Sequence, residues 1–134
     1  MVTAKPTVVL DPLTPAHARL ISILEQVSQL CEVDLRITCG REGHGDTDPH
    51  TRGEALDVSV RDLANATIVR MWHLFRAMLG PAWTVLYECP TPPTTAALIG
   101  IAYVNAAATA PHFHLQPRKG TRWPPQPSIP VTDV

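Results

Sequence analysis

Four residues of this chain combine metal-binding side chains with a spacing that could form one site. His50 and Asp57 lie seven residues apart in the segment HTRGEALD, and His112 and His114 lie two apart in HFHLQ. A catalytic zinc site uses three histidine or carboxylate ligands and leaves a fourth position open for water. The chain offers such a set, with His112 or His114 as the third ligand. Each histidine taken alone also fits a polar loop or a surface position.

The residues around these candidates alternate as β-strands do. In EALDVSV the apolar side chains fall on one side and Asp57 on the other, and in HFHLQ the two histidines share a face with Gln116. If the apolar faces pack on helices, the opposite face of the sheet becomes a polar groove that carries Asp57, His112 and His114. Glu88, near the end of WTVLYEC, is a further candidate for that groove.

Two helices and four strands are expected to position this groove. Thr14 and Pro15 are typical of a helix start, and Gly80-Pro81 of a helix end, with Asp62 or Asn65 as the cap of the second helix. The helices are predicted over 14–31 and 62–80, and the strands over 33–39, 54–60, 83–89 and 112–116. The segment 98–104 fits either a strand or a segment packed over the sheet. This order favours an α+β fold with a mostly antiparallel sheet and helices on one face.

The three cysteines do not form a recognisable framework. Their number is odd and no CxxC occurs, so a disulfide scaffold or a thiolate zinc finger is not expected for Cys31, Cys39 and Cys89. The alternation of VDLRITC places Cys39 on the same side as Leu35 and Ile37. We therefore interpret the cysteines as small buried apolar residues.

Composition excludes several function classes. The formal net charge is −1 and there is no basic block, which disfavours nucleic-acid binding through a charged surface. No apolar run is long enough to cross a bilayer, so membrane insertion is not expected. The N-terminal segment MVTAKPTVVLDP lacks the apolar core of a secretory signal, so a role outside the cytoplasm needs another route of release.

Several motifs resemble the M15 zinc peptidases, whose fold is shared with the hedgehog signalling domain. DPHTRGEALDV resembles their S-x-H-x-x-G-x-A-x-D signature through His50, Gly53, Ala55 and Asp57. HFHL resembles the later H-x-H strand, and ITCGRE resembles the S-G-Y-R segment. These segments span residues 36–116. We accordingly predict a single zinc-peptidase-like domain over 1–116 and a proline-rich C-terminal tail over 117–134.

The resemblance implies that His50, Asp57 and His114 bind Zn²⁺. Many members place a general-base carboxylate three residues before the final histidine, where this chain has Pro111. Hedgehog-like members instead have a glutamate at the end of the preceding strand, which corresponds here to Glu88. Because a loop can be lengthened at modest entropic cost, Glu88 could still reach the metal. The alternative is a solvated glutamate at a strand end.

Other residues receive weaker assignments. Arg41 resembles the arginine that stabilises the oxyanion and the substrate carboxylate, with a register one residue short. His112 is interpreted as a positioning residue or as a hydrogen-bond donor to the transition state. Asp48, two residues before His50, either orients that region or caps a turn. His44 and Asp46 are interpreted as loop residues near the site.

The resemblance implies a zinc metallopeptidase acting on peptidoglycan stem peptides, of the D-Ala-D-Ala carboxypeptidase or the L-Ala-D-Glu endopeptidase type. Such an enzyme would be made in the cytoplasm and would act at the bacterial cell wall or be carried in a virion. One alternative is a catalytically inactive zinc-binding hedgehog-like module. Another is a structural component of a phage particle, which would have other particle proteins as partners.

Overall fold

The first long helix forms where the hydrophobic spacing predicts it. The computed structural model describes residues 1–45, 47–121 and 123–124, and in it α1 spans Pro15–Cys31. The side chain of Thr14 caps this helix by accepting a hydrogen bond from the backbone N–H of His17. The helix ends at Glu32, which adopts a left-handed conformation. The predicted helix and its cap are confirmed.

The second long helix, α2, spans Asn65–Leu79. Its N-cap is Ala64, which makes no side-chain capping bond, so the predicted cap at Asp62 or Asn65 is wrong. Asp62 instead adopts a positive φ of 65° in the turn that precedes the helix. Gly80 ends the helix with a φ of 82°, as predicted.

Six strands form one sheet in the described part of the chain, in the order β1-β2-β3-β6-β4-β5. The strands are β1 (Val2–Ala4), β2 (Leu35–Cys39), β3 (Leu56–Ser59), β4 (Trp83–Cys89), β5 (Ala102–Val104) and β6 (His112–Pro117). The sheet is mixed. Its centre, from β2 through β3 and β6 to β4, is antiparallel, and the outer strands β1 and β5 each pair in parallel with their neighbours. The fold is therefore α+β.

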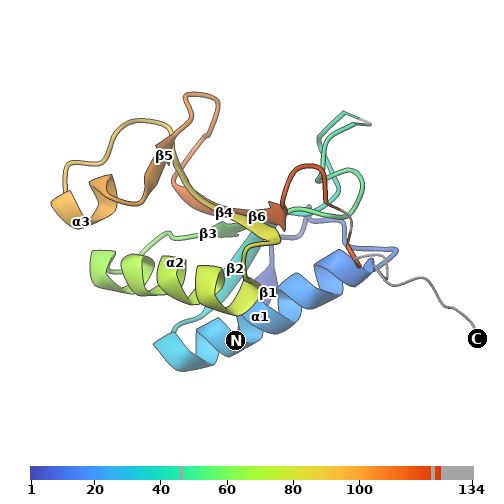
Figure 1. Cartoon of the computed structure of the whole chain (residues 1–134), viewed down its shortest axis with the longest axis horizontal. Coiled ribbons are helices and arrows are strands. Elements are labelled where there is room, and N and C mark those ends of the chain that lie inside the picture. Colours follow the sequence, from blue (N-terminus) through green and yellow to red (C-terminus); the bar gives the residue numbers. More distant parts are fainter. Residues whose placement is uncertain (46, 122, 125–134) are drawn as a thin grey trace, which may run out of the picture.

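Both edges of the sheet differ in detail from the sequence prediction. β1 was not predicted, because three residues are too few to show a clear alternation. The segment 98–104 is divided between the short helix α3 (Ala96–Ile99) and the edge strand β5. Figure 1 shows α3 and β5 at one end of the molecule and the loop 40–55 at the other.

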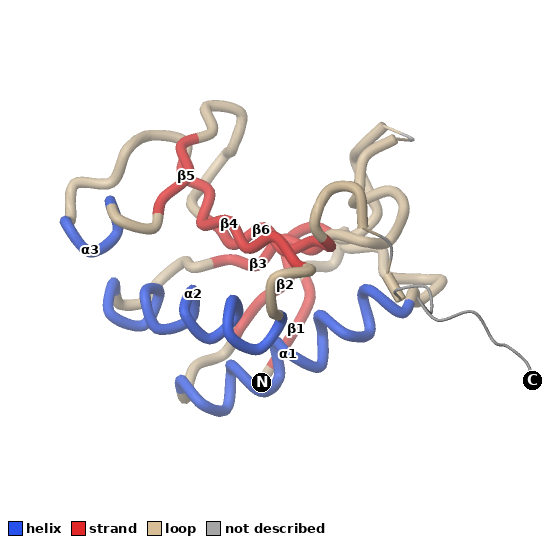
Figure 2. The backbone as a smooth tube through the Cα atoms, in the orientation of Figure 1, coloured by secondary structure: helices blue, strands red, loops and turns tan. Residues whose placement is uncertain are grey.

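The two long helices cover one face of the sheet (Figures 1 and 2). Phe75 of α2 meets Phe113 of β6 edge to face, with ring centroids 5.1 Å apart, and both side chains are fully buried. Leu56, Val58 and Leu115 are buried on the same face. The remaining face is free to carry the polar residues of the central strands. No helix in the described residues has the length and apolar character needed to cross a bilayer.

An irregularity in β2 changes the position of Cys39. Ile37 pairs with Val58, whereas Cys39 pairs with Asp57, the neighbour of Val58. Strand β2 therefore has one extra residue between these two pairs. Such a bulge reverses the side to which the following side chain points. The prediction that Cys39 shares the apolar face of Leu35 and Ile37 is therefore wrong, since Cys39 lies opposite Asp57 on the polar face.

The described part of the C-terminal tail begins with the end of β6 at Pro117. Trp123 packs against Trp83 of β4, with ring centroids 5.0 Å apart. This contact attaches the start of the tail to the domain. Residues 122 and 125–134 of the predicted tail, and Asp46 of the loop, lie outside the described residues.

Candidate metal centre

The strand register brings together four of the predicted site residues. In the β3–β6 pairing Asp57 lies directly opposite His114, and in the β4–β6 pairing Glu88 lies directly opposite His112. Side chains directly opposite in adjacent strands point to the same face. The polar face predicted from alternation therefore lies along β3, β6 and β4, on the side away from α1 and α2.

His50 joins this group from the loop before β3. Its Nε2 atom is 3.3 Å from Oδ1 of Asp57, and Nδ1 of His114 is 2.9 Å from the same oxygen. Two ligands bound to zinc at tetrahedral angles stand about 3.3 Å apart. The ligand atoms of His50, Asp57 and His114 are thus close enough to share one ion.

The second ring nitrogen of each histidine is occupied elsewhere. Nδ1 of His50 donates to the carbonyl oxygen of Gly40 at 3.0 Å, and Nε2 of His114 is 2.6 Å from Oε1 of Gln116. Nδ1 of His112 likewise donates to the carbonyl of Ala110 at 2.9 Å. A carbonyl oxygen can only accept, so in the neutral tautomer the other nitrogen presents a lone pair. In the neutral form these nitrogens present lone pairs beside the carboxylates, and in the protonated form the same nitrogens donate hydrogen bonds to them.

Glu88 reaches the same cluster. Its Oε1 atom is 3.3 Å from Nε2 of His112 and 3.7 Å from Nδ1 of His114. Its other oxygen accepts a hydrogen bond from the amide of Asn105 at 2.8 Å. The carboxylate is buried, with 8% of the residue exposed. The alternative of a solvated glutamate at a strand end is therefore wrong.

The pKa values of the cluster reflect these contacts. Burial alone would raise the pKa of Asp57, but hydrogen bonds from His114 and His50 outweigh it and lower the pKa. Burial alone would lower the pKa of His112, but the carboxylate of Glu88 and the carbonyl of Ala110 raise it to about 8. The hydrogen bond from His112 lowers the pKa of Glu88. A cation, either a proton or a metal ion, is thus favoured between these groups.

Asp48 orients the loop that carries His50. Oδ1 of Asp48 accepts a hydrogen bond from the backbone N–H of His50 at 2.8 Å. Its other oxygen, Oδ2, is 3.3 Å from Nδ1 of His44. A carboxylate that accepts from the backbone N–H two residues on forms an Asx-turn, so Asp48 caps this turn and through it orients the His50 region.

Arg41 contacts a different part of the chain. Its Nη1 atom donates to the carbonyl oxygen of Pro12 at 3.1 Å and lies beside Gly53. Among the described residues it forms no hydrogen bond or ion pair with His50, Asp57 or His114. The oxyanion role of Arg41 stays a prediction.

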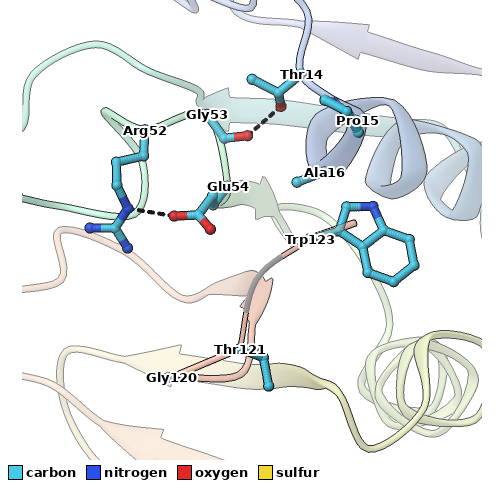
Figure 3. A pocket seen from close by; sticks show the side chains of 9 residues that line it. All are labelled: Thr14, Pro15, Ala16, Arg52, Gly53, Glu54, Gly120, Thr121 and Trp123. Atoms are coloured by element: carbon cyan, nitrogen blue, oxygen red, sulfur yellow. Dashed lines mark hydrogen bonds and ion pairs between the residues drawn. The ribbon is translucent and has the colours of Figure 1, made fainter. Parts of the chain in front are cut away.

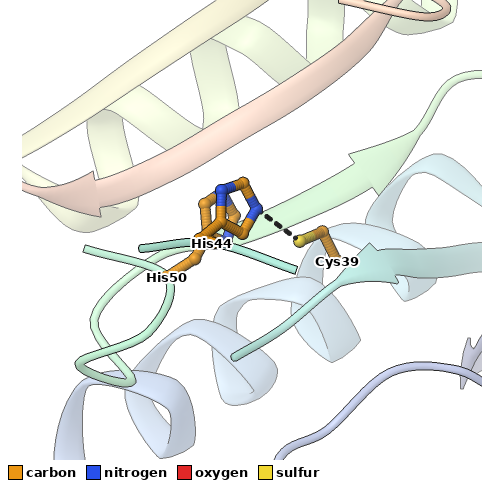
Figure 4. Close-up of side chains that lie close together, drawn as sticks. All are labelled: Cys39, His44 and His50. Atoms are coloured by element: carbon orange, nitrogen blue, oxygen red, sulfur yellow. Dashed lines mark hydrogen bonds between the residues drawn. The ribbon is translucent and has the colours of Figure 1, made fainter. Parts of the chain in front are cut away.

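Cys39 and His44 lie next to the cluster, as Figure 4 shows. Sγ of Cys39 is 3.1 Å from Nε2 of His44, and the rings of His44 and His50 are stacked. Burial raises the pKa of the Cys39 thiol to about 12, with a further contribution from Asp57. The neutral thiol is therefore favoured, which argues against a thiolate nucleophile activated by His44.

The larger of the two described pockets lies apart from the cluster. It has a volume of about 610 Å³ and lies between the start of α1, the segment 52–54 and the tail near Trp123 (Figure 3). Arg52 and Glu54 form an ion pair at its edge, and Thr14 donates to the carbonyl of Gly53. No predicted metal ligand lines this pocket.

The sequence prediction left out several groups that hold the site. Gln116 could have been named, because alternation already placed it on the face of His112 and His114. The carbonyl of Gly40 and the amide of Asn105 had no signal, since both come from loops. Comparison of the chain with protein-family models, with curated proteins and with solved structures gave no match.

Proposed function

We propose that this chain is a zinc-dependent peptidase that hydrolyses peptide bonds in the stem peptides of bacterial peptidoglycan. The observation that carries the proposal is the convergence of His50 Nε2, Asp57 Oδ1 and His114 Nδ1, with Glu88 beside them. The choice of peptidoglycan peptides rests on the resemblance of DPHTRGEALDV and HFHL to M15 zinc peptidases. Both the D-Ala-D-Ala and the L-Ala-D-Glu bond are candidates.

The residues present fit a zinc ion. Two imidazoles and one carboxylate are a donor set that zinc accepts, and three protein ligands leave a position for water. The free nitrogens of His50 and His114 face Asp57, while Gly40 and Gln116 hold their opposite nitrogens. Hydrogen bonds of this kind fix the ring orientation of metal-binding histidines. The same three residues are those that the family resemblance implies as ligands.

The chemistry follows from the groups around the three ligands. When bound, a zinc ion supplies a Lewis acid and lowers the pKa of a coordinated water towards about 7. Glu88 would accept a proton from the attacking water and pass it to the leaving amine. His112, whose Nε2 faces both Glu88 and Asp57, would in its protonated form donate a hydrogen bond to the carbonyl oxygen as that oxygen gains negative charge.

One observation favours a second candidate, a zinc-binding module without catalysis. Glu88 is held by both His112 and Asn105, and the hydrogen bond from His112 lowers its pKa. A carboxylate whose pKa is lowered is a weaker base, whereas an efficient general base has a pKa close to the working pH. The two candidates share the metal site and differ in turnover.

One experiment separates the candidates. The freshly purified chain is analysed for metal content, and its products on purified peptidoglycan are identified by mass spectrometry before and after treatment with a chelator. The peptidase proposal expects one zinc per chain and cleaved stem peptides whose formation stops with the chelator and returns with zinc. Bound zinc without cleavage supports the inactive module. A chain that neither contains nor takes up zinc rules out both candidates.

A further inference from the structure

A second group of metal-binding side chains lies beside the first. Cys39, His44 and His50 bring a sulfur and two imidazole nitrogens within 4.8 Å of one another. Figure 4 shows the thiol of Cys39 directed at the ring of His44, with the ring of His50 alongside. Neither Cys39 nor His44 has a part in the proposed peptidase mechanism.

The bulge in β2 creates this group. Regular alternation would direct Cys39 to the apolar face with Ile37, but the irregular pairing places it opposite Asp57. The thiol therefore points to the polar face at the point where β2 passes into the loop that carries His44. Bulges of this kind commonly redirect a side chain next to a functional site.

His44 is oriented as metal-binding histidines are. Its Nδ1 atom is 3.3 Å from Oδ2 of Asp48, and its Nε2 atom is 3.1 Å from Sγ of Cys39. A carboxylate behind an imidazole fixes the ring and makes the opposite nitrogen a better ligand. Stacking on His50, with ring centroids 4.4 Å apart and an angle of 11° between the planes, restricts the ring further.

We propose that Cys39 and His44 bind a second thiophilic divalent cation, Zn²⁺ or Cd²⁺, next to the first metal site. On binding, the cation displaces the thiol proton of Cys39 to solvent, and the resulting thiolate with an imidazole is a ligand pair that favours these ions over Mg²⁺ or Ca²⁺. The partly exposed position of the pair leaves it accessible from solvent, since His44 is exposed and Cys39 is half-buried. Bound there, the ion would join the end of β2 to the loop 40–50.

The second site is weaker than the first. His50 belongs to both groups, and its Nε2 atom faces Asp57. While that nitrogen serves the first ion, the second ion keeps Cys39 and His44 as protein ligands and completes its coordination with water. Two protein ligands bind a cation less tightly than three, so the second ion binds after the first.

The second site extends the proposed function: its ligand pair is independent of the first site, and only the order of binding rests on that site. Removal of His114 disables the first site but leaves Cys39, His44 and Asp48 in place. Failure of the peptidase proposal and failure of the second site therefore give different results, because the first site contains no sulfur and sulfur-to-metal absorption arises only from a cysteine.

The test is a titration of the full-length, metal-free chain with cadmium chloride, followed by ultraviolet absorption from sulfur-to-cadmium charge transfer. The variants are Cys39→Ser, His44→Gln and His114→Ala, with Cys31→Ser as the matched control for a half-buried cysteine outside the group. Circular dichroism checks that each variant is folded. His44 is exposed, so its replacement provides a variant with little effect on folding.

We expect the wild-type chain to develop the absorption only beyond the first equivalent of cadmium. Cys31→Ser should match it, and His114→Ala should keep the absorption. Cys39→Ser should lose the absorption. His44→Gln lacks one of the two protein ligands, so it should need at least about tenfold more cadmium to reach the same absorption. The proposal is overturned if Cys39→Ser keeps the absorption, if no protein develops it, or if His44→Gln titrates like the wild type.

Discussion

Glu88 and His112 lie directly opposite each other in the β4–β6 ladder, with Oε1 of Glu88 3.3 Å from Nε2 of His112. Residues 89–111, with α3 and β5, separate them in the sequence. The antiparallel pairing of β4 and β6 brings them together in spite of this insertion. The glutamate near the end of β4 therefore lies beside the candidate ligand His114, in the position that the proposed mechanism gives to the general base.

Replacing Glu88 by glutamine should remove catalysis and leave the metal in place. The amide keeps the size of the side chain but cannot accept a proton from water, so we expect hydrolysis to fall by about 10²- to 10⁴-fold. Zinc content should stay equal to that of the wild type. Glu25→Gln, on the exposed face of α1, is the matched control. Undiminished cleavage by Glu88→Gln would show that another group is the base.

Replacing Gln116 by leucine should weaken zinc binding. Nε2 of His114 loses its acceptor, so the ring is less well oriented and is a poorer ligand. We expect zinc affinity, measured by competition with a chromogenic chelator, to fall by about 10- to 100-fold. Gln29→Leu, at an exposed position of α1, should have no effect. Equal zinc affinities of the two variants would show that Gln116 does not support zinc binding.

The stability of the metal-free chain should fall between pH 6.5 and about 8. The pKa of His112 is raised from 6.5 to about 8, so its contribution is complete below 6.5 and is lost as the pH rises through the higher value. This difference corresponds to about 2 kcal/mol in the free energy of unfolding, since one pKa unit equals about 1.36 kcal/mol. Urea unfolding at a series of pH values measures it.

Zinc should reverse this pH dependence. The ligand histidines must be neutral to bind a metal, so zinc affinity increases over the range in which the metal-free chain loses stability. His112→Gln should flatten the profile of the metal-free chain. A metal-free chain with constant stability between pH 6.5 and 8 would contradict the assigned interaction of His112 with Glu88.

Replacing Gly53 by alanine should destabilise the fold more than replacing Gly43. Both glycines have a positive φ, of 73° and 77°, so both substitutions carry a backbone cost of about 1 kcal/mol. At Gly43 an added Cβ meets open space, whereas at Gly53 it collides with the side chain of Thr14. We expect Gly53→Ala to cost about 1–3 kcal/mol more. Equal losses in urea unfolding would contradict this packing.

Local patterns in the sequence determined the long elements and the polar face. The spacing of apolar residues and the Thr14 cap predicted α1, and alternation predicted the central strands and placed Asp57, His112 and His114 on one side of them. These features depend on residues close together in the chain, which is why they are visible without a structure. The motif around His50 added the expected ligand from the loop.

Tertiary structure decided which side chains meet. The pairing of β4 with β6 placed Glu88 at the cluster, because strand register is set by contacts between residues distant in the sequence. The bulge in β2 moved Cys39 to the polar face, and loop folding supplied Gly40 and Asn105. The parallel edges of the sheet likewise depend on long-range pairing. The sequence alone thus identified the candidate metal ligands. The register of the sheet determined which other side chains lie next to them.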